Sequence, residues 1–299
     1  MKSRAIFALT QLRTKMGEYF RKYLDVTMHL FDVLIKPIIL YMSDFWGCLP
    51  LRKDNPIDKT QNKFLKQILG VQTQTSTLGI LLETGSVPLS LFSQKFCIKN
   101  WERIAKKQAN ILVQTSYCNS YVKKMFWTER IKTCLSINGM QDLFENYGQI
   151  QVHNVYFTRL TDIFHQNAFA DIRREDSKLR TYALLKTQIG AEQYLKLIKN
   201  INDRTTFTKL RLSNHNLMIE KGRHLNIENN LRLCPFCPNA IEDEIHFITK
   251  CECKSFVMCR ESPFKSISEE NKILTFTHID NLQPFKILMT HCDAVQHYS

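Results

Sequence analysis

The sequence predicts a mainly α protein, with helical, bundle-like N-terminal and middle parts and a small cysteine-rich module near the C-terminus. Two observations support the helical prediction: apolar residues recur at three- and four-residue steps, and the period-two alternation of strands is hardly present. A third observation is a group of three cysteines and one histidine within eighteen residues. Hydrophobic residues make up 44% of the 299-residue chain, which is enough for a sizeable core. The chain is therefore expected to fold.

The N-terminal part begins with two apolar helical patterns. In the first, Ile6, Leu9 and Leu12 share one helix face. The second covers residues 26–46 and is broken near Pro37, where the proline ring would kink or end a helix. Both patterns predict helices for this region.

The next predicted helix has signals at both of its ends. Asn55 is a good N-cap residue, Pro56 suits the first helical position, and Gly70 suits the C-terminal stop. Four apolar residues are expected to face inward: Phe64, Leu65, Ile68 and Leu69.

Three further helices are predicted downstream. Helical patterns cover residues 89–112, residues 177–190, and residues 205–221, the last of which is closed by Gly222. The region 115–175 gives weaker patterns and predicts only helices joined by loops.

The charge is unevenly distributed along the chain. The formal net charge is +13, and residues 1–110 hold 17 basic and 8 acidic side chains. From Cys234 onward the chain holds 6 basic and 9 acidic side chains. A bound phosphate backbone is therefore expected on the first third. Together with the helical patterns, this predicts four parts: a basic helical region (1–110), a helical connector (111–200), a helix with the cysteine-rich module (201–260) and a C-terminal tail (261–299).

Two sets of basic side chains are the candidate nucleic-acid contacts. Lys59, Lys63 and Lys66 follow one helix face at i, i+4 and i+7. The second set lies on the outer face of the 89–112 helix and consists of Arg103, Lys106 and Lys107. Such side chains neutralise phosphates without reading bases, so the predicted partner is RNA or DNA bound with low sequence specificity. A merely solvated basic face is the alternative interpretation.

The cysteine-rich module has the spacing C-x2-C-x8-H-x4-C, formed by Cys234, Cys237, His246 and Cys251. Three thiolates and an imidazole suit Zn²⁺, and four protein ligands leave no open position, so the predicted zinc is structural. Cys253 could replace Cys251 as the fourth ligand, and Cys259 is a more distant choice. Scattered reduced cysteines are the alternative interpretation.

No other motif points to a chemical reaction. There is no glycine-rich phosphate loop and no local signature of a thiol nucleophile, so no catalytic residue and no small-molecule substrate are predicted. Neither a secretory signal nor an apolar run of about 20 residues is present. The protein is expected to be intracellular, in the nucleus or the cytoplasm with the nucleus favoured, and away from membranes, with its ten cysteines reduced or metal-bound.

Several stretches, in order along the chain, resemble the C-terminal part of reverse transcriptases of LINE-type (non-LTR) retrotransposons. They are LFDVLIKPIILYMSDFWG (30–47), DKTQNKFLKQILGV (58–71), KLRTYALLKTQIG (178–190), TKLRLSNHNLMIEKGRH (208–224) and LCPFCPNAIEDEIHFITKC (233–251). The first two are similar to the thumb of that family, and the last is similar to its zinc-binding module.

The resemblance implies a non-catalytic, nucleic-acid-binding piece of a retroelement polyprotein. Lys59, Lys63 and Lys66 would then lie on a thumb helix that faces template and primer, and other retroelement proteins are possible partners. The paired aspartates of the family's catalytic palm and its endonuclease have no counterpart in this sequence. A zinc-stabilised protein-interaction scaffold, or an inert relic of a transposon, is the competing reading.

Overall fold

A computed structural model describes residues 2–50, 55–146, 151–174, 177–253 and 257. These residues are mainly helical, as predicted, and contain no strand; their one isolated bridge pairs Leu233 with Ile241. The chain divides into two compact units, the first formed by residues 1–65 and 85–170 and the second by residues 66–84 and 171 onward. The predicted tail (261–299) and Cys259 lie outside the described residues.

Most helices belong to the first unit. They are α1 (Lys2–Met16), α2 (Tyr19–Lys22), α3 (Leu24–Leu30), the π-helical turn η1 (Phe31–Ile35), α4 (Lys36–Ile39), α5 (Ser43–Trp46), α6 (Pro56–Leu69), α8 (Leu89–Ala105), α9 (Ile111–Val122), α10 (Phe126–Ile137), the 3-10 turn η2 (Gln141–Phe144) and α11 (Val152–Ile172). The last four residues of α6 and the last two of α11 fall in the second unit.

The second unit holds shorter helices. They are α7 (Thr77–Thr84), α12 (Arg180–Leu185), α13 (Tyr194–Leu197), α14 (Ile201–Arg211), α15 (Met218–His224), the 3-10 turn η3 (Asn229–Leu231) and the π-helical turn η4 (His246–Lys250).

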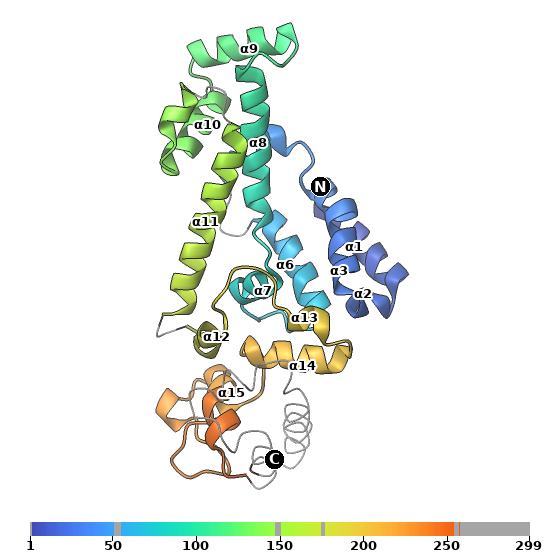
Figure 1. The fold of residues 1–299 in the computed structure, drawn as a ribbon, viewed down its shortest axis with the longest axis vertical. Helices are drawn as coiled ribbons and strands as arrows, with labels where there is room; N and C mark the ends of the chain where they lie inside the picture. The colour runs from blue at the N-terminus through green and yellow to red at the C-terminus, as the bar shows by residue number, and fades with distance from the viewer. Residues whose placement is uncertain (1, 51–54, 147–150, 175–176, 254–256, 258–299) are drawn as a thin grey trace. The chain divides into compact units, whose positions relative to one another are not determined.

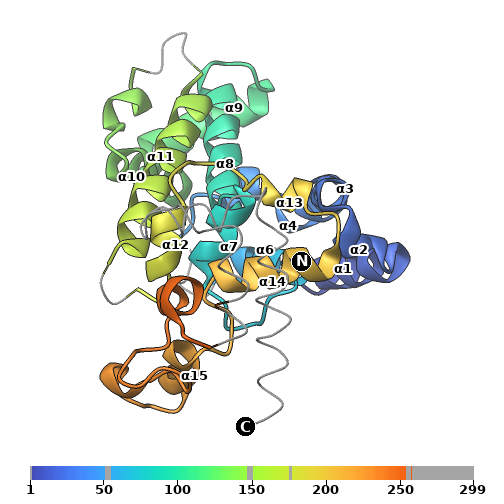
Figure 2. The same ribbon diagram turned by 60° about the horizontal axis from the view of Figure 1, so that its bottom comes forward.

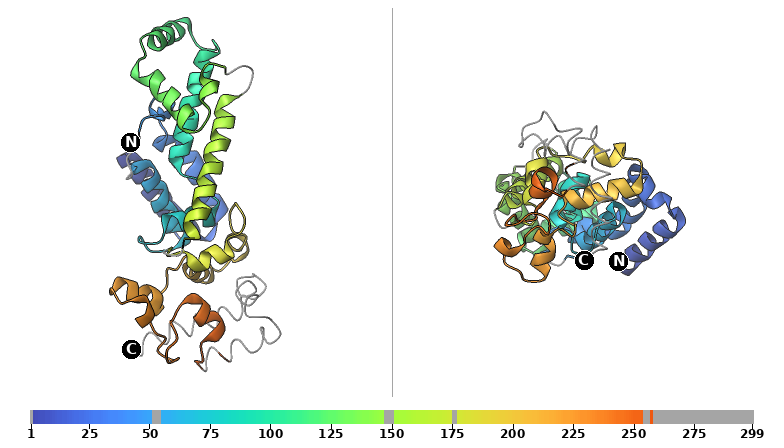
Figure 3. Two further views of the ribbon diagram at one scale, coloured as in Figure 1. Left: turned by 90° about the vertical axis from the view of Figure 1, so that its left-hand side faces the viewer. Right: turned by 90° about the horizontal axis from the view of Figure 1, so that it is seen from below.

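The first unit is organised around α8 and α11, which lie side by side (Figure 1). Their direction is antiparallel, because Glu102 near the end of α8 accepts the backbone N–H of Val152 at the start of α11, at 3.1 Å. At the C-terminal end of α8, Trp101 is fully buried and stacks on Phe144 with ring centroids 5.4 Å apart. Helix α9 turns across this end of α8 (Figure 3).

The predicted break near Pro37 takes the form of the π-helical turn η1, which directly precedes α4. Proline has no backbone N–H and cannot form the usual hydrogen bond to the carbonyl four residues earlier. A π turn, which has i→i+5 hydrogen bonds, interrupts the regular helical pattern just before this proline. Its first residue, Phe31, is buried and stacks on Phe64 of α6 at 4.1 Å. The apolar face predicted for α6 is confirmed, since Phe64, Leu65, Ile68 and Leu69 are at most 3% exposed.

Three of the predicted helices have other bounds in the structure. The 177–190 helix is wrong at both ends, because α12 covers only Arg180–Leu185. The 89–112 helix is wrong beyond Ala105, because Lys107 adopts a left-handed φ of 57° and a new helix starts at Ile111. The single helix predicted for 205–221 is also wrong. It is divided into α14 and α15 by a turn in which Ser213 has a φ of 48°, and Gly222 lies inside α15, where a Cβ would meet the side chain of Arg232.

The second unit places α7 beside α14 (Figure 2). Between them lies a buried polar contact, in which Arg211 donates to both carboxylate oxygens of Glu83 at 2.7 and 3.3 Å. Tyr194 Oη also donates to Glu83, at 2.5 Å. Charged groups therefore form part of the interior of this unit.

Within the described part of the chain, every helix is too short or too polar to cross a bilayer.

Candidate metal centre and basic groove

The first two cysteines of the module lie on one tight turn. The bridge between Leu233 and Ile241 closes this turn, and the backbone N–H of Cys234 donates to Ala240 O at 2.8 Å. The chain reverses through Asn239, whose φ of 63° is one that asparagine tolerates better than most residues. This turn brings the side chains of Cys234 and Cys237 to the same side.

The other two ligands lie at the two ends of η4. Asp243 caps this segment, since its Oδ1 accepts the backbone N–H of His246 at 2.7 Å. The backbone N–H of Cys251 in turn donates to His246 O at 2.8 Å, which closes the π-helical turn. With four residues between them, the imidazole of His246 and the thiol of Cys251 thus lie on one side of a single turn.

The four donor atoms of Cys234, Cys237, His246 and Cys251 all lie within 4.8 Å of one another, and all four residues are buried. Cys251 Sγ is 3.8 Å from Cys234 Sγ and 3.9 Å from Cys237 Sγ. Soft sulfur donors with one imidazole form a set that a transition-metal ion accepts. The cluster can therefore hold a metal ion. Cys253, the alternative fourth ligand, is half-buried and stands outside this group.

Burial affects the protonation of two thiols of the cluster. Burial raises the pKa of both Cys234 and Cys251. Thiolates are the metal-binding form, so a cation is needed to stabilise several of them in so small a space. Cys237 Sγ also accepts the backbone N–H of Glu252 at 3.1 Å, which helps to fix the position of this sulfur.

Glu244 connects the metal-binding loop to the helices of the second unit. Its buried carboxylate accepts hydrogen bonds from four groups at 2.8 to 3.0 Å, which are Arg180 Nη2, Thr181 Oγ1, Ser213 Oγ and His215 Nε2. Burial would raise the pKa of Glu244, but His215 and Arg180 outweigh this effect and hold it at about 2. The acidic residue that precedes the histidine ligand is therefore an internal anchor of the module.

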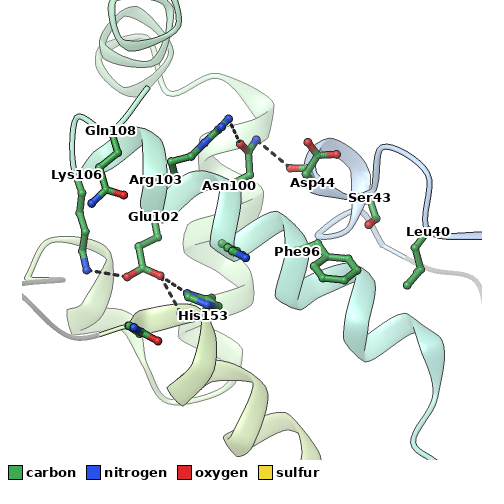
Figure 4. Close-up of a pocket in the computed structure, with 12 residues that line it drawn as sticks. Leu40, Ser43, Asp44, Phe96, Asn100, Glu102, Arg103, Lys106, Gln108 and His153 are labelled. Carbon is green, nitrogen blue, oxygen red and sulfur yellow. Dashed lines mark hydrogen bonds and ion pairs between the residues drawn. The ribbon is translucent and has the colours of Figure 1, made fainter. Parts of the chain in front are cut away.

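A second concave site lies on the first unit beside α8 (Figure 4). It has a volume of about 810 Å³. Lys99 and Arg103 on α8 and Lys106, the residue that caps its C-terminus, follow one another at i, i+4 and i+7 and line this groove. The remaining lining residues are Leu40, Ser43, Asp44, Phe96, Asn100, Glu102, Gln108, Gln151 and His153.

The three basic side chains of the groove differ in how far other protein groups already balance their charge. Lys99 is exposed. Arg103 is exposed as well, and its Nη2 donates to Asn100 Oδ1 at 3.0 Å. Lys106 Nζ is half-buried and lies 2.7 Å from Glu102 Oε1, so its charge is largely balanced within the protein. Lys99 and Arg103 are therefore the cations best placed for an external anion.

Glu102 forms the floor of the groove. Its carboxylate accepts the backbone N–H groups of Val152 and His153, at 3.1 and 3.2 Å, and so caps the first turn of α11. His153 Nδ1 also lies 2.6 Å from Glu102 Oε2. Burial alone would raise the pKa of Glu102, but the hydrogen bonds from Lys106 and His153 lower it overall.

We expect Glu102→Gln to lower the free energy of unfolding at pH 7 by about 1 kcal/mol, the usual contribution of a helix cap. Because its folded-state pKa is lowered, the carboxylate stabilises the fold above its unfolded pKa of about 4.3, and this stabilisation is lost as the pH falls through the folded value. Urea unfolding should show a gap between variant and wild type at pH 7 that closes as the pH falls below the folded-state pKa of Glu102. Glu129→Gln, at an exposed glutamate of α10, is the matched control. A gap that persists at low pH would contradict the role of the charge.

The predicted lysine stripe of α6 does not form one surface. Lys59 and Lys63 are exposed, whereas Lys66 is half-buried and its Nζ donates to Thr73 O. Burial and the nearby Lys178 lower the pKa of Lys66. In the second set, Lys107 is exposed in the left-handed turn after α8. The groove thus brings together Arg103 and Lys106 with Lys99, which is not among the contacts predicted from the sequence.

Two features of the sites had no signal in the sequence. His153 and Gln151 join the groove only because the start of α11 packs on α8, about 50 residues away along the chain. The pair of Glu83 and Arg211 is separated by 128 residues. No short motif spans such distances.

No protein-family model, curated protein or solved structure matches this chain.

Proposed function

We propose that this chain is a non-catalytic nucleic-acid-binding piece of a LINE-type reverse transcriptase, with a structural zinc ion in its C-terminal module. The observation that carries the proposal is the groove of about 810 Å³ lined by Lys99, Arg103 and Lys106. The resemblance of several stretches of the sequence to the thumb and zinc-binding module of that family supports it. RNA or DNA would be bound with low sequence specificity, in the nucleus or the cytoplasm.

The groove suits a phosphate backbone in both charge and polarity. Lys99 and Arg103 offer positive charge at its rim, and the amides of Gln108 and Gln151 offer further hydrogen-bond donors for phosphate or sugar oxygens. The exposed Lys59 and Lys63 on α6 add cations to the same unit. Contacts of this kind position a strand without reading its bases.

Zinc is the metal that we propose for the cluster. A buried set of three sulfur donors and one imidazole nitrogen fits Zn²⁺, which has no redox chemistry and prefers four ligands. The protein supplies all four donors, so the ion would stabilise the fold and leave no position for a reacting water. The same arrangement supports a structural rather than a catalytic role for the ion. Extension of a primed template by purified protein would contradict the non-catalytic part of the proposal.

The proposal predicts that reversing the charge of two groove residues weakens nucleic-acid binding. We expect Lys99→Glu/Arg103→Glu to lower the affinity for labelled RNA at least tenfold at moderate salt. The slope of log K against log salt should become shallower by about two, since two phosphate contacts are lost. Fluorescence anisotropy at several salt concentrations measures both quantities. Lys123→Glu/Lys124→Glu makes the same charge change at exposed lysines outside the groove and should have a smaller effect. Equal losses in both variants would contradict a groove-specific site.

A second candidate function, a protein-interaction scaffold, is favoured by α9. This helix carries no charged residue and buries none of its side chains, and Leu112 and Val122 are 76% and 78% exposed. Beside it lies an apolar pocket of about 360 Å³ lined in part by Phe45 and Trp127. If neither Lys99→Glu/Arg103→Glu nor Lys59→Glu/Lys63→Glu changes nucleic-acid affinity, the scaffold, or an inert transposon relic, becomes the better reading.

A further inference from the structure

Two tyrosines form an exposed aromatic pair at the start of the first unit. Tyr19 and Tyr23 stack with ring centroids 5.8 Å apart and an interplanar angle of 20°. Each residue is about half exposed, at 49% and 50%. The ammonium group of Lys22 lies 5.8 Å from one centroid and 5.7 Å from the other. The pair therefore presents aromatic surface next to a positive charge.

The fold explains why these rings face outward. Phe20 and Leu24 are buried, and Phe20 packs edge-on against Phe64 at 6.1 Å. Tyr19 is the first residue of α2 and Tyr23 is the C-cap residue that follows it, and both side chains remain about half exposed. The core is already filled by their neighbours, so the tyrosine pair contributes little to packing.

The surroundings of the pair are basic. Arg13 and Lys15, in the last turn of α1, are exposed and lie a few residues before Tyr19. From Arg13 to Tyr23 the chain holds four basic side chains and one acidic side chain, Glu18. Cations beside an exposed aromatic surface are what a nucleic-acid strand with unstacked bases requires.

The geometry points to a stacking platform for the bases of a single strand, formed by Tyr19, Tyr23 and Lys22. Arg13 and Lys15 would hold the neighbouring phosphates. This inference rests on the proposed nucleic-acid binding and adds a preference to it. Bases within a duplex are stacked on one another and present no free face, so the platform favours unpaired RNA or DNA.

The test compares an ordinary single-stranded DNA with a strand of equal length in which most nucleotides are abasic. Both strands offer the same phosphates, and only the first offers bases. Full-length wild-type protein is expected to bind the ordinary strand about tenfold more tightly. In Tyr19→Leu/Tyr23→Leu this ratio should fall to about one, because the affinity for the ordinary strand drops while that for the abasic strand stays the same.

Two control variants isolate the rings. Tyr19→Phe/Tyr23→Phe keeps both aromatic faces and should keep the tenfold ratio. Tyr41→Leu removes an exposed tyrosine outside the pair and should also keep it. If wild-type protein binds both strands equally, the platform is refuted while the proposed function stands. If wild-type protein binds neither strand nor RNA at low salt, the proposed function fails as well. An equal loss for both strands in the leucine variant would also refute stacking.

Discussion

Replacing Cys237 with serine is expected to abolish binding of the metal ion and to unfold the loop from Cys234 to Cys251. A serine hydroxyl is a poor substitute for a thiolate, and the remaining three donors cannot complete a tetrahedral set. In zinc-finger peptides the bound ion supplies about 10–16 kcal/mol, which is nearly all of the stability of such small modules. The module has little apolar packing of its own, with Phe247 and Ile248 as its main buried side chains. Without the ion, no interaction offsets the free-energy cost of burying the thiols.

The measurement combines metal analysis with hydrogen exchange. Wild-type protein should carry one zinc per chain and the Cys237→Ser variant none, and any other metal in wild-type protein would refute zinc. The amide hydrogens of Cys234 and Cys251, bonded to Ala240 O and His246 O, should lose their protection in the variant. Cys253→Ser and Cys118→Ser are the matched controls, and both should retain the ion. Loss of zinc from Cys253→Ser would show that the fourth ligand is misassigned.

The same variant also tests how far the damage spreads. All three tryptophans, Trp46, Trp101 and Trp127, belong to the first unit. Their fluorescence therefore reports on that unit alone, and its unfolding curve is expected to stay unchanged. The anchor at Glu244 should spread some loosening to Ser213 and Arg180. Collapse of helicity throughout the chain would contradict this local role of the ion.

Elements with strong local signals could be predicted from the sequence. Helix α6 begins and ends where Asn55, Pro56 and Gly70 indicate, because a cap and a left-handed stop depend only on neighbouring residues. Ile57 N donates to Asn55 Oδ1 at 3.0 Å, and Gly70 has a φ of 70°. The metal-binding cluster was also predictable, since its four residues lie within eighteen positions and both of its turns are local.

Elements that depend on tertiary contacts could not be predicted. The breaks at Lys107 and Ser213 use left-handed backbone at residue types that rarely adopt it. At Ser213 the strain is offset because its hydroxyl donates to the buried Glu244, a partner 31 residues away. The sequence predicts a helix stop at Gly222, but this glycine lies inside α15 and lets Arg232 pack closely against the helix. In each case a distant contact overrides the local pattern.

The buried charges of the second unit show the same limit. Glu83 is 0% exposed, although it lies in α7, whose otherwise apolar sequence gives no sign of a buried ion pair. Its partner Arg211 is 4% exposed and packs against aromatic side chains. The ring centroids of Tyr194 and Tyr182 lie 5.4 and 5.6 Å from its guanidinium carbon. Arg211 also donates to Glu192 at 2.8 Å. Burial would lower the pKa of Arg211, but the charge of Glu83 raises it overall.

Breaking this buried pair is expected to destabilise the second unit strongly. Arg211→Met removes the cation while leaving Glu83 in the interior, with Tyr194 Oη as its main remaining donor. Loss of one partner of a buried ion pair typically costs 3–5 kcal/mol, because the other charge stays desolvated. Hydrogen exchange of α14 amides in increasing urea should show this loss, whereas tryptophan fluorescence from the first unit should not change.

The double variant Glu83→Gln/Arg211→Met separates the cost of an unpaired charge from the cost of lost packing. With the carboxylate neutral, the desolvation penalty disappears, and Tyr194 can still donate to the amide oxygen. The double variant is therefore expected to regain at least 1–2 kcal/mol relative to Arg211→Met alone. Lys209→Met, which removes a lysine from the same helix, should cost less than 1 kcal/mol. An Arg211→Met variant as stable as this control would mean that the pair contributes nothing to the fold. A double variant no more stable than Arg211→Met would instead assign the loss to packing of the guanidinium among Tyr182, Tyr194 and Phe207.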